Sequence, residues 1–134
     1  MTFYQKELNR IRETVYGNQA QIDAVIAIKN YIDTYYETDL NLNLLSKKKA
    51  ISKFHLLRLF KRYYGITPRQ YLIDKRITKA KTHLKHGMSV TETCFAVGFQ
   101  SLGSFSSLFK AKTGKSPVLF QKEQLSRSTS TSQA

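Results

Sequence analysis

Four residues on an expected helix over residues 53–64 could contact the bases of a nucleic acid: Lys53, Phe54, Leu57 and Arg58. Apolar spacing leaves them on the outer face and predicts a buried set made of Leu56, Leu59, Phe60 and Tyr63. The planar guanidinium of Arg58 can bond guanine O6 and N7 together, which provides about 1 to 3 kcal/mol of discrimination. A solvated arginine or a phosphate contact is the alternative. Arg58 is therefore the main candidate for base selection.

Phe54 and Leu57 are apolar residues on the outer side of a basic helix. Such residues need a cover, and thymine methyl groups could supply it. Packing against the long helix that follows is the other explanation, and the sequence leaves both open.

Six cationic residues are expected to contact the phosphate backbone: Lys47, Lys61, Arg62, Lys110, Lys112 and Lys115. Lys47 belongs to a run with Lys48 and Lys49 beside the first helix of the motif. A simple solvated basic face explains that run equally well.

The sequence repeats itself at an offset of 49 residues. Five identical pairs share this offset: Leu59 and Leu108, Phe60 and Phe109, Lys61 and Lys110, Gly65 and Gly114, Pro68 and Pro117. The pairs indicate one helical unit present twice, and two such units on a basic chain favour two contacts to a long anionic partner.

The second copy exposes a different set of side chains at the matching positions: Leu102, Gly103, Ser104 and Ser107. None of the four can make a bidentate contact with a base. We therefore expect the second unit to add affinity and register, and the first unit to supply most of the base selection.

Start and stop signals predict the helices that position these residues. Ser52 is a predicted N-cap for helix 53–64, which ends at Gly65. Thr67-Pro68 begins a long linker helix that ends at Gly87. The second copy uses the same signals, namely Ser89 with Glu92, Gly98, Ser101, Gly114 and Ser116-Pro117, and the apolar residues expected inside helix 90–96 are Val90, Cys94 and Ala96.

The two ends of the chain are more polar than its middle. Residues 1–21 read as a helix-compatible arm, and the helix that follows should bury one side made of Ile22, Val25, Ile26, Ile32 and Tyr36. Residues 126–134 are almost all Ser, Thr, Gln and Ala and lack the apolar side chains that could offset the cost of ordering, so we expect a disordered tail.

These patterns predict an all-α, homeodomain-like fold of about seven helices, in which a long helix joins two helix-turn-helix subdomains. The expected ranges are an arm at 1–21, a first subdomain at 22–67, a linker helix at 68–87, a second subdomain at 88–124 and a tail at 125–134.

Charge favours a nucleic acid as the partner. The 134 residues carry a net charge of +13, and residues 40–122 hold 17 basic side chains against only Asp74 and Glu92. Neutralising phosphates with such a field releases counterions. An anionic membrane surface or a merely solvated face remains the alternative.

Catalysis has little support in the sequence. His55, His83 and His86 are the only histidines and have no acidic or cysteine cluster beside them, so we expect no enzyme, metal, cofactor or small-molecule site. Cys94 is the only cysteine, which excludes an intrachain disulfide and fits a reducing cytoplasm. Neither an apolar membrane span nor a signal pattern is present, so we expect no membrane partner.

The motifs resemble the DNA-binding domain of AraC/XylS-type transcription regulators over about residues 22–123. The second half carries the likeness through Gly98-Phe99, Phe105, Phe109-Lys110, Gly114, Pro117 and Phe120, and the first through Leu45, Ser52, His55-Leu56, Leu59-Phe60-Lys61, Gly65, Pro68 and Tyr71. The resemblance implies a sequence-specific regulator that reads two adjacent major grooves of double-stranded DNA and contacts RNA polymerase to activate transcription on the nucleoid. By position, the family's base-contacting residues correspond to the two exposed sets named above.

This chain departs from the family in three respects. Ala50 stands where the family usually has glycine, and Lys49 stands where it usually has a small residue. The separate sensing or dimerisation domain of most members is missing, so the chain is either a short regulator or part of a longer one. The competing function is a basic, non-enzymatic adaptor or a non-specific nucleic-acid-binding protein. Single-stranded RNA binding is disfavoured, because the aromatic residues recur at helix-core spacing.

Overall fold

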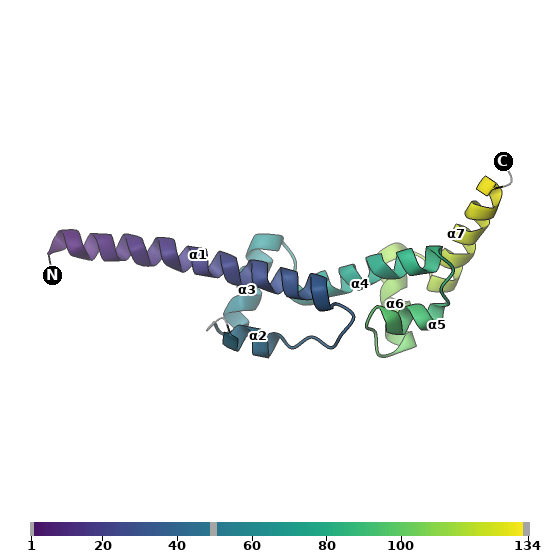
Figure 1. Ribbon diagram of the computed structural model, residues 1–134, viewed down its shortest axis with the longest axis horizontal. Helices are drawn as coiled ribbons and strands as arrows, with labels where there is room; N and C mark the ends of the chain where they lie inside the picture. Colours follow the sequence, from purple (N-terminus) through teal and green to yellow (C-terminus); the bar gives the residue numbers. More distant parts are fainter. Residues whose placement is uncertain (1, 49–50, 133–134) are drawn as a thin grey trace. The chain divides into compact units, whose positions relative to one another are not determined.

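The computed structural model describes residues 2–48 and 51–132, and these form seven helices and no strand (Figure 1). The helices are α1 (Phe3–Tyr35), α2 (Leu42–Lys48), α3 (Lys53–Tyr64), α4 (Pro68–Lys85), α5 (Val90–Ala96), α6 (Leu102–Thr113) and α7 (Pro117–Ser132). The all-α prediction is confirmed. The chain divides into two compact units, one of residues 1–31 with 41–68 and the other of residues 32–40 with 69–134.

The first unit contains most of α1 together with α2 and α3. Its buried side chains include Ala24, Val25 and Ile28 of α1 and Leu56, Leu59 and Phe60 of α3. Helix α2 packs against α3, and its Ser46 is buried with the hydroxyl donating to the Asn43 carbonyl at 2.8 Å. The α2–α3 pair and α1 together form the core of this unit, and this packing positions the outer face of α3.

The second unit contains α4 to α7 and has a core built around aromatic rings. The ring centroids of Phe105 and Phe109 lie 5.7 Å apart. The Phe99 centroid lies 5.3 Å from that of Phe105, and the Phe120 centroid lies 5.4 Å from that of Phe109. Smaller side chains of α4, of α5 and of the residue that caps α5 complete this core, namely Ile77, Ala80, Leu84, Cys94 and Val97. Aromatic pairs in tilted and edge-to-face geometry stabilise a core beyond their buried area.

Three apolar residues differ from the predicted burial. Tyr63 is 47% exposed, and Tyr64 instead packs on the Phe60 ring at 4.7 Å, one helical turn further on. Ile26 is exposed while Ile28 is fully buried. Ala96 is exposed, because Val97 takes the buried position at the end of α5. The predicted burial was therefore wrong at one position of α1 and at one position near the end of each of α3 and α5, whereas Val25 and Ile32 of the predicted α1 face are buried.

The two ends of the chain also differ from the expectation. Helix α1 begins at Phe3 and runs through the predicted boundary at residue 22 without a break. Helix α7 continues through Ser132, where the sequence predicted disorder from residue 125. No proline or glycine follows Pro117 in that stretch, and extending an existing helix is much easier than starting one. The predicted turn at Ala50 lies outside the described residues.

Candidate nucleic-acid interface

Helix α3 presents the first set of predicted contact residues on its exposed face. The Ser52 Oγ accepts a hydrogen bond from the His55 backbone N–H at 3.1 Å, which caps the helix and fixes where its first turn begins. Lys53, Phe54 and Arg58 follow on the exposed side, and Leu57 is half-buried at its edge. The structure therefore brings all four predicted base-contact residues together on one helix.

The electrostatic field of this face is positive. Among the described residues, no carboxylate pairs with Lys53, Arg58, Lys61 or Arg62, and the first turn of α3 contains no acidic side chain. Lys61 and Arg62 lie in the last turn, where the helix dipole favours cations. Four cations with no competing carboxylate are available to an anionic ligand.

Phe54 is the apolar feature of the same face. Its side chain is 76% exposed, so the alternative that it packs against another helix does not hold in this structure. The exposed ring is available to an apolar group of a ligand, such as a thymine methyl. Leu57 is half-buried, so part of its side chain is covered by the first unit.

Helix α2 supplies one further predicted cation. Lys47 is exposed on α2, whereas the side chain of Lys48 and the whole of Lys49 lie outside the described residues. Only Lys47 of that run can be placed beside α3.

Helix α6 has the same length and the same kinds of cap as α3, and these shared features are the frame of the repeat. Ser101 caps it by accepting from the Ser104 backbone N–H at 3.0 Å, and the Gly114 N–H bonds the Lys110 carbonyl at 2.8 Å. The corresponding Gly65 and Lys61 bond in α3 has the same length, and the two glycines have φ values of +79° and +82°. The two helices start and stop 49 residues apart, and Leu56 and Phe105 are both fully buried at equivalent positions.

The exposed face of α6 differs in chemistry from that of α3. The four predicted contact residues of this helix, Leu102, Gly103, Ser104 and Ser107, are all exposed. Ser107 stands where α3 has Arg58, and Gly103 stands where α3 has Phe54. Lys110 and Lys61, in contrast, are the same residue at equivalent positions and are both exposed. The two helices therefore share one exposed lysine, whereas the large side chains of α3 are replaced by smaller ones in α6.

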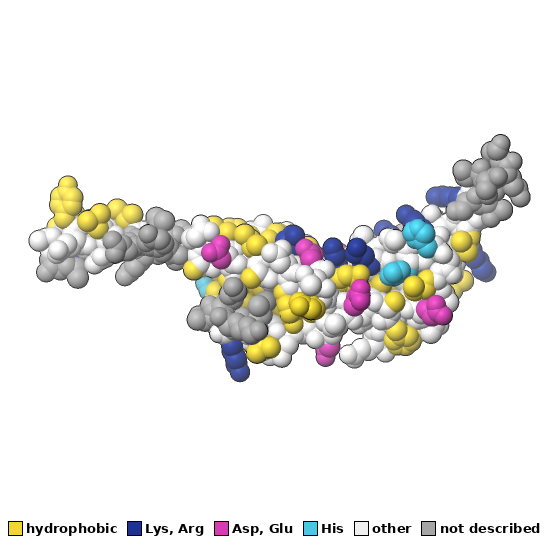
Figure 2. All heavy atoms as spheres, in the orientation of Figure 1, with side chains coloured by type: hydrophobic (Ala, Val, Ile, Leu, Met, Phe, Trp, Pro, Cys, Tyr) yellow, Lys and Arg dark blue, Asp and Glu magenta, His cyan; other side chains and the backbone are white. Residues whose placement is uncertain are grey.

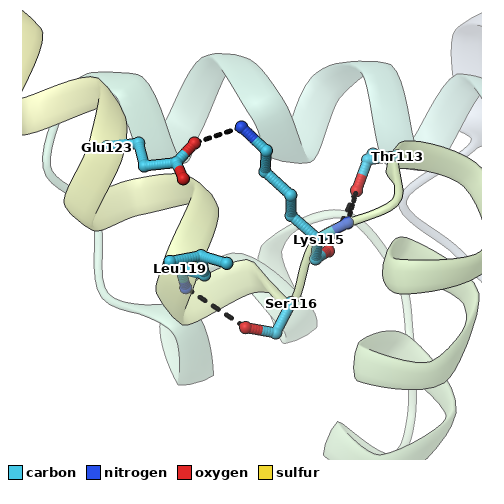
Figure 3. A network of polar contacts seen from close by, with 5 residues as sticks. All are labelled: Thr113, Lys115, Ser116, Leu119 and Glu123. Atoms are coloured by element: carbon cyan, nitrogen blue, oxygen red, sulfur yellow. Dashed lines mark hydrogen bonds and ion pairs between the residues drawn. The ribbon is translucent and has the colours of Figure 1, made fainter.

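Two of the three predicted cations of the second unit are already paired. Lys112 Nζ lies 2.9 Å from an Asp74 carboxylate oxygen. Lys115 pairs with Glu123 of α7, and its backbone N–H bonds the Thr113 hydroxyl (Figure 3). In the same turn, Ser116 Oγ accepts from the Leu119 N–H and caps α7 (Figure 3). These ion pairs weaken the field of Lys112 and Lys115 and leave Lys110 as the unneutralised member of the set among the described residues.

Arg76 has a structural role that sequence reasoning missed. Its Nε donates to the Tyr36 carbonyl at 2.7 Å, its Nη2 to the Thr38 carbonyl at 3.0 Å, and its guanidinium lies 5.5 Å from the Phe99 ring centroid. Burial lowers the pKa of this guanidinium, and the charge of Asp39 opposes that shift. The contacts tie the segment that follows α1 to α4 across about 40 residues of sequence, a separation that local patterns do not reveal.

His86 has a local hydrogen-bond contact, and Cys94 is buried. His86 Nδ1 lies 2.7 Å from the Thr82 carbonyl at the end of α4. Burial raises the pKa of the Cys94 thiol, which disfavours the reactive thiolate. In the described part of the chain, no group of three or more His, Cys, Asp or Glu residues could hold a metal ion, and no helix there is long and apolar enough to span a membrane.

The chain is similar to known helix-turn-helix proteins. Residues 45–123 match a family model described as a helix-turn-helix domain. The transcriptional activator RhaS of Escherichia fergusonii is 30% identical over 110 residues, which cover 81% of this chain and 38% of that protein. The chain spans only 28% to 55% of the first four curated relatives that it matches.

Solved structures match most of the chain. The C-terminal domain of the response regulator yesN from Fusobacterium nucleatum is 31% identical with a TM-score of 0.68, and the match covers 74% of this chain and 98% of that domain. The DNA-binding domain of AdpA in complex with a target DNA shares the fold at 22% identity and a TM-score of 0.71, covering 77% and 94% of the two chains.

Proposed function

Since the chain belongs to the AraC-type family of helix-turn-helix DNA-binding domains, we propose that it binds double-stranded DNA sequence-specifically and regulates transcription. The observation that carries the proposal is the exposed face of α3, on which Arg58 and Phe54 stand among unpaired cations. In a helix-turn-helix, this second helix enters the major groove and its N-terminal residues face the base edges. The proposed activity is binding and requires no catalytic step.

The proposal includes two major-groove contacts, one by α3 and one by α6. The support is the shared frame, because both helices have a serine N-cap, a left-handed glycine at the C-terminus and a buried aromatic at the same place. A duplicated frame with two exposed faces is suited to two successive contacts on one duplex.

The two helices divide the work in this proposal. Lys53, Phe54, Leu57 and Arg58 select bases, while Leu102, Gly103, Ser104 and Ser107 make weaker base contacts. Lys61 and Lys110, equivalent in the repeat, bind phosphates in both units, and Lys47 and Arg62 add to the first unit. Lys112 and Lys115 can contribute only by exchanging Asp74 and Glu123 for phosphate.

We extend the proposal to activation through RNA polymerase, which would place the protein in the cytoplasm on the nucleoid. The support is the named activity of RhaS, a transcriptional activator of which this chain matches 38%. The second unit also exposes the apolar side chains of Phe95, Val118 and Leu119, which a protein partner could cover.

Two variants of Arg58 test the assignment to α3. Duplexes selected from a random pool by the wild-type chain define its preferred site, and Arg58→Lys keeps the charge while removing the bidentate fork. We expect Arg58→Lys and Arg58→Ala to relax one half of the selected site, with a loss of about 1 to 3 kcal/mol on the preferred base.

Lys110→Ala is the matched phosphate variant, and it should weaken all duplexes about equally while lowering the salt dependence. If both Arg58 variants select the same sequences as the wild type, the assignment is wrong. If the wild type itself selects no sequence, the non-specific basic protein becomes the better description.

A further inference from the structure

Acidic side chains are scarce around the two contact helices α3 and α6. Residues 40–123 contain three carboxylates, Asp74, Glu92 and Glu123, against 17 basic side chains. Asp74 and Glu123 each hold a lysine, whereas no ion pair among the described residues involves Glu92. On the face shown in Figure 2, the acidic side chains are isolated and form no patch. Two of the three carboxylates therefore neutralise lysines at the end of α6 and in the turn that follows it.

The two lysine-holding carboxylates occupy the same position of the 49-residue repeat. Asp74 is the seventh residue of α4 and Glu123 is the seventh residue of α7, and these two helices directly follow α3 and α6. The lysines that they hold have no counterparts in the first unit, where Tyr63 and Ile66 stand at the matching positions. The second unit thus has lysine–carboxylate pairs at positions where the first unit has none.

The pair with Asp74 turns Lys112 toward α4. Lys112 comes three residues after Phe109 and seven after Phe105, both fully buried, so it stands at the edge of the packed face of α6. Its Nζ lies 2.9 Å from an Asp74 carboxylate oxygen, and the two side chains are 41% and 46% exposed. A lysine carries its charge on a flexible four-carbon stem. Without the carboxylate, this ammonium group is able to turn toward a phosphate.

Lys115 lies in a turn whose backbone is held by hydrogen bonds. Its N–H donates to the Thr113 hydroxyl at 3.2 Å, and that hydroxyl donates to the Phe109 carbonyl at 2.8 Å. The side chain of Lys115 extends along α7 to Glu123 in the second turn of that helix (Figure 3). Because the backbone is fixed, Glu123 determines where the ammonium group lies.

Ion pairs as exposed as these are weak, and phosphate competes with them directly. An exposed pair changes an equilibrium by about 2- to 5-fold. A phosphate must displace the carboxylate before the lysine can bind it, so each pair should lower the affinity for DNA by that factor. Phosphate contacts carry no sequence information, and the factor should therefore be the same for every duplex.

We propose that Asp74 and Glu123 are affinity-determining residues, which hold Lys112 and Lys115 away from DNA phosphates; this inference rests on the proposed function. The two carboxylates lower the affinity for all duplexes alike. They thereby keep the non-specific binding of a chain of net charge +13 weak, and they leave its preference among sequences unchanged.

The test is an equilibrium titration of the full chain against its selected duplex and a scrambled duplex, at about 50 mM and about 200 mM salt. Asp74→Asn and Glu123→Gln keep the size of each side chain and remove its charge. Each should raise the affinity for both duplexes by about 2- to 5-fold. Each freed lysine should also steepen the slope of log affinity against log salt by about 0.9.

Glu92→Gln is the matched control. It makes the same charge change in the same unit, and its side chain is exposed, but it releases no lysine. Its effect on affinity should be smaller than that of either test variant, and the salt slope should stay as in the wild type, because a distant exposed charge is screened by salt.

A double-mutant cycle assigns the gain to the lysine itself. Lys112→Ala should lower the affinity more in the Asp74→Asn background than in the wild type, because only there is the ammonium group released to phosphate. If Asp74→Asn or Glu123→Gln raises the affinity no more than Glu92→Gln, the inference is wrong for that carboxylate and the proposed function stands. A gain that survives Lys112→Ala would refute the role of Asp74 in the same way. A wild type that binds neither duplex would refute the proposed function and this inference with it.

Discussion

Arg58 and Ser107 occupy the same position in two equivalent helices, and the exchange between them is the main chemical difference at the interface. A guanidinium at this place can read guanine with two bonds, whereas a serine hydroxyl bonds many groups with little preference. The lysine three residues further on is retained in both helices. In the proposed division of roles, the retained lysines provide affinity shared by both helices, and the exchanged side chains provide selectivity.

Gly98 gives the sharpest stability prediction for a single residue. Its φ is +102°, and an added Cβ would lie 2.7 Å from the Tyr36 carbonyl oxygen and 3.0 Å from Arg76 Nε. Gly98→Ala should lower the free energy of unfolding by about 2 kcal/mol or more, because it adds strain and displaces the Arg76 contacts. Urea unfolding followed by circular dichroism measures the change.

Gly103→Ala is the control for this prediction. Gly103 is helical, and its added Cβ meets nothing within 4 Å. The free energy of unfolding should stay constant or rise by up to about 1 kcal/mol. If the two variants lost equal amounts of unfolding free energy, the close approach at Gly98 would not be the cause of its loss.

Helices α3 and α6 show how a duplicated element is specified by its ends. Both have serine N-caps and left-handed glycine C-caps, and each serine Oγ accepts one hydrogen bond of ordinary length from a backbone N–H. Ser52→Ala and Ser101→Ala should each lower the free energy of unfolding by about 1 kcal/mol, since each leaves a backbone N–H unsatisfied. Denaturant titration of both single variants and of the double variant measures these losses.

The double variant should show the sum of the two losses, because the caps share no partner. Ser107→Ala, exposed in the middle of α6, is the matched control and should change stability by less than about 0.5 kcal/mol. A cap variant as stable as this control would contradict the assignment of that cap.

Most helix bounds could be predicted because caps and left-handed glycines are local signals. Helix 53–64 and the 18-residue helix from Pro68 match the structure. Tyr63 and Ile26 were assigned to the wrong face, because burial depends on which neighbours arrive from distant parts of the chain. The Arg76 contacts and the ion pairs of Lys112 and Lys115 depend on the same distant neighbours. The contact residues of α3 and α6 could be placed on exposed faces, and their contacts with DNA stay predictions.

At the scale of the whole molecule, the uneven charge makes electrostatic attraction to any duplex unavoidable. Residues 40–122 hold 17 of the 22 basic side chains and two of the nine acidic ones. Attraction of this kind is non-specific and falls steeply with salt. We therefore expect the exposed α3 face, with Arg58 and Phe54, to account for most of the sequence preference that survives at higher salt.

The most direct test of this account is an equilibrium titration of the full chain against its selected duplex and a scrambled duplex of equal length and composition, at about 50 mM and about 200 mM salt. The account predicts that both affinities fall steeply with salt, while the selected duplex remains bound more tightly by about 1,000-fold or more. Equal affinity for the two duplexes at the higher salt concentration would contradict sequence-specific recognition.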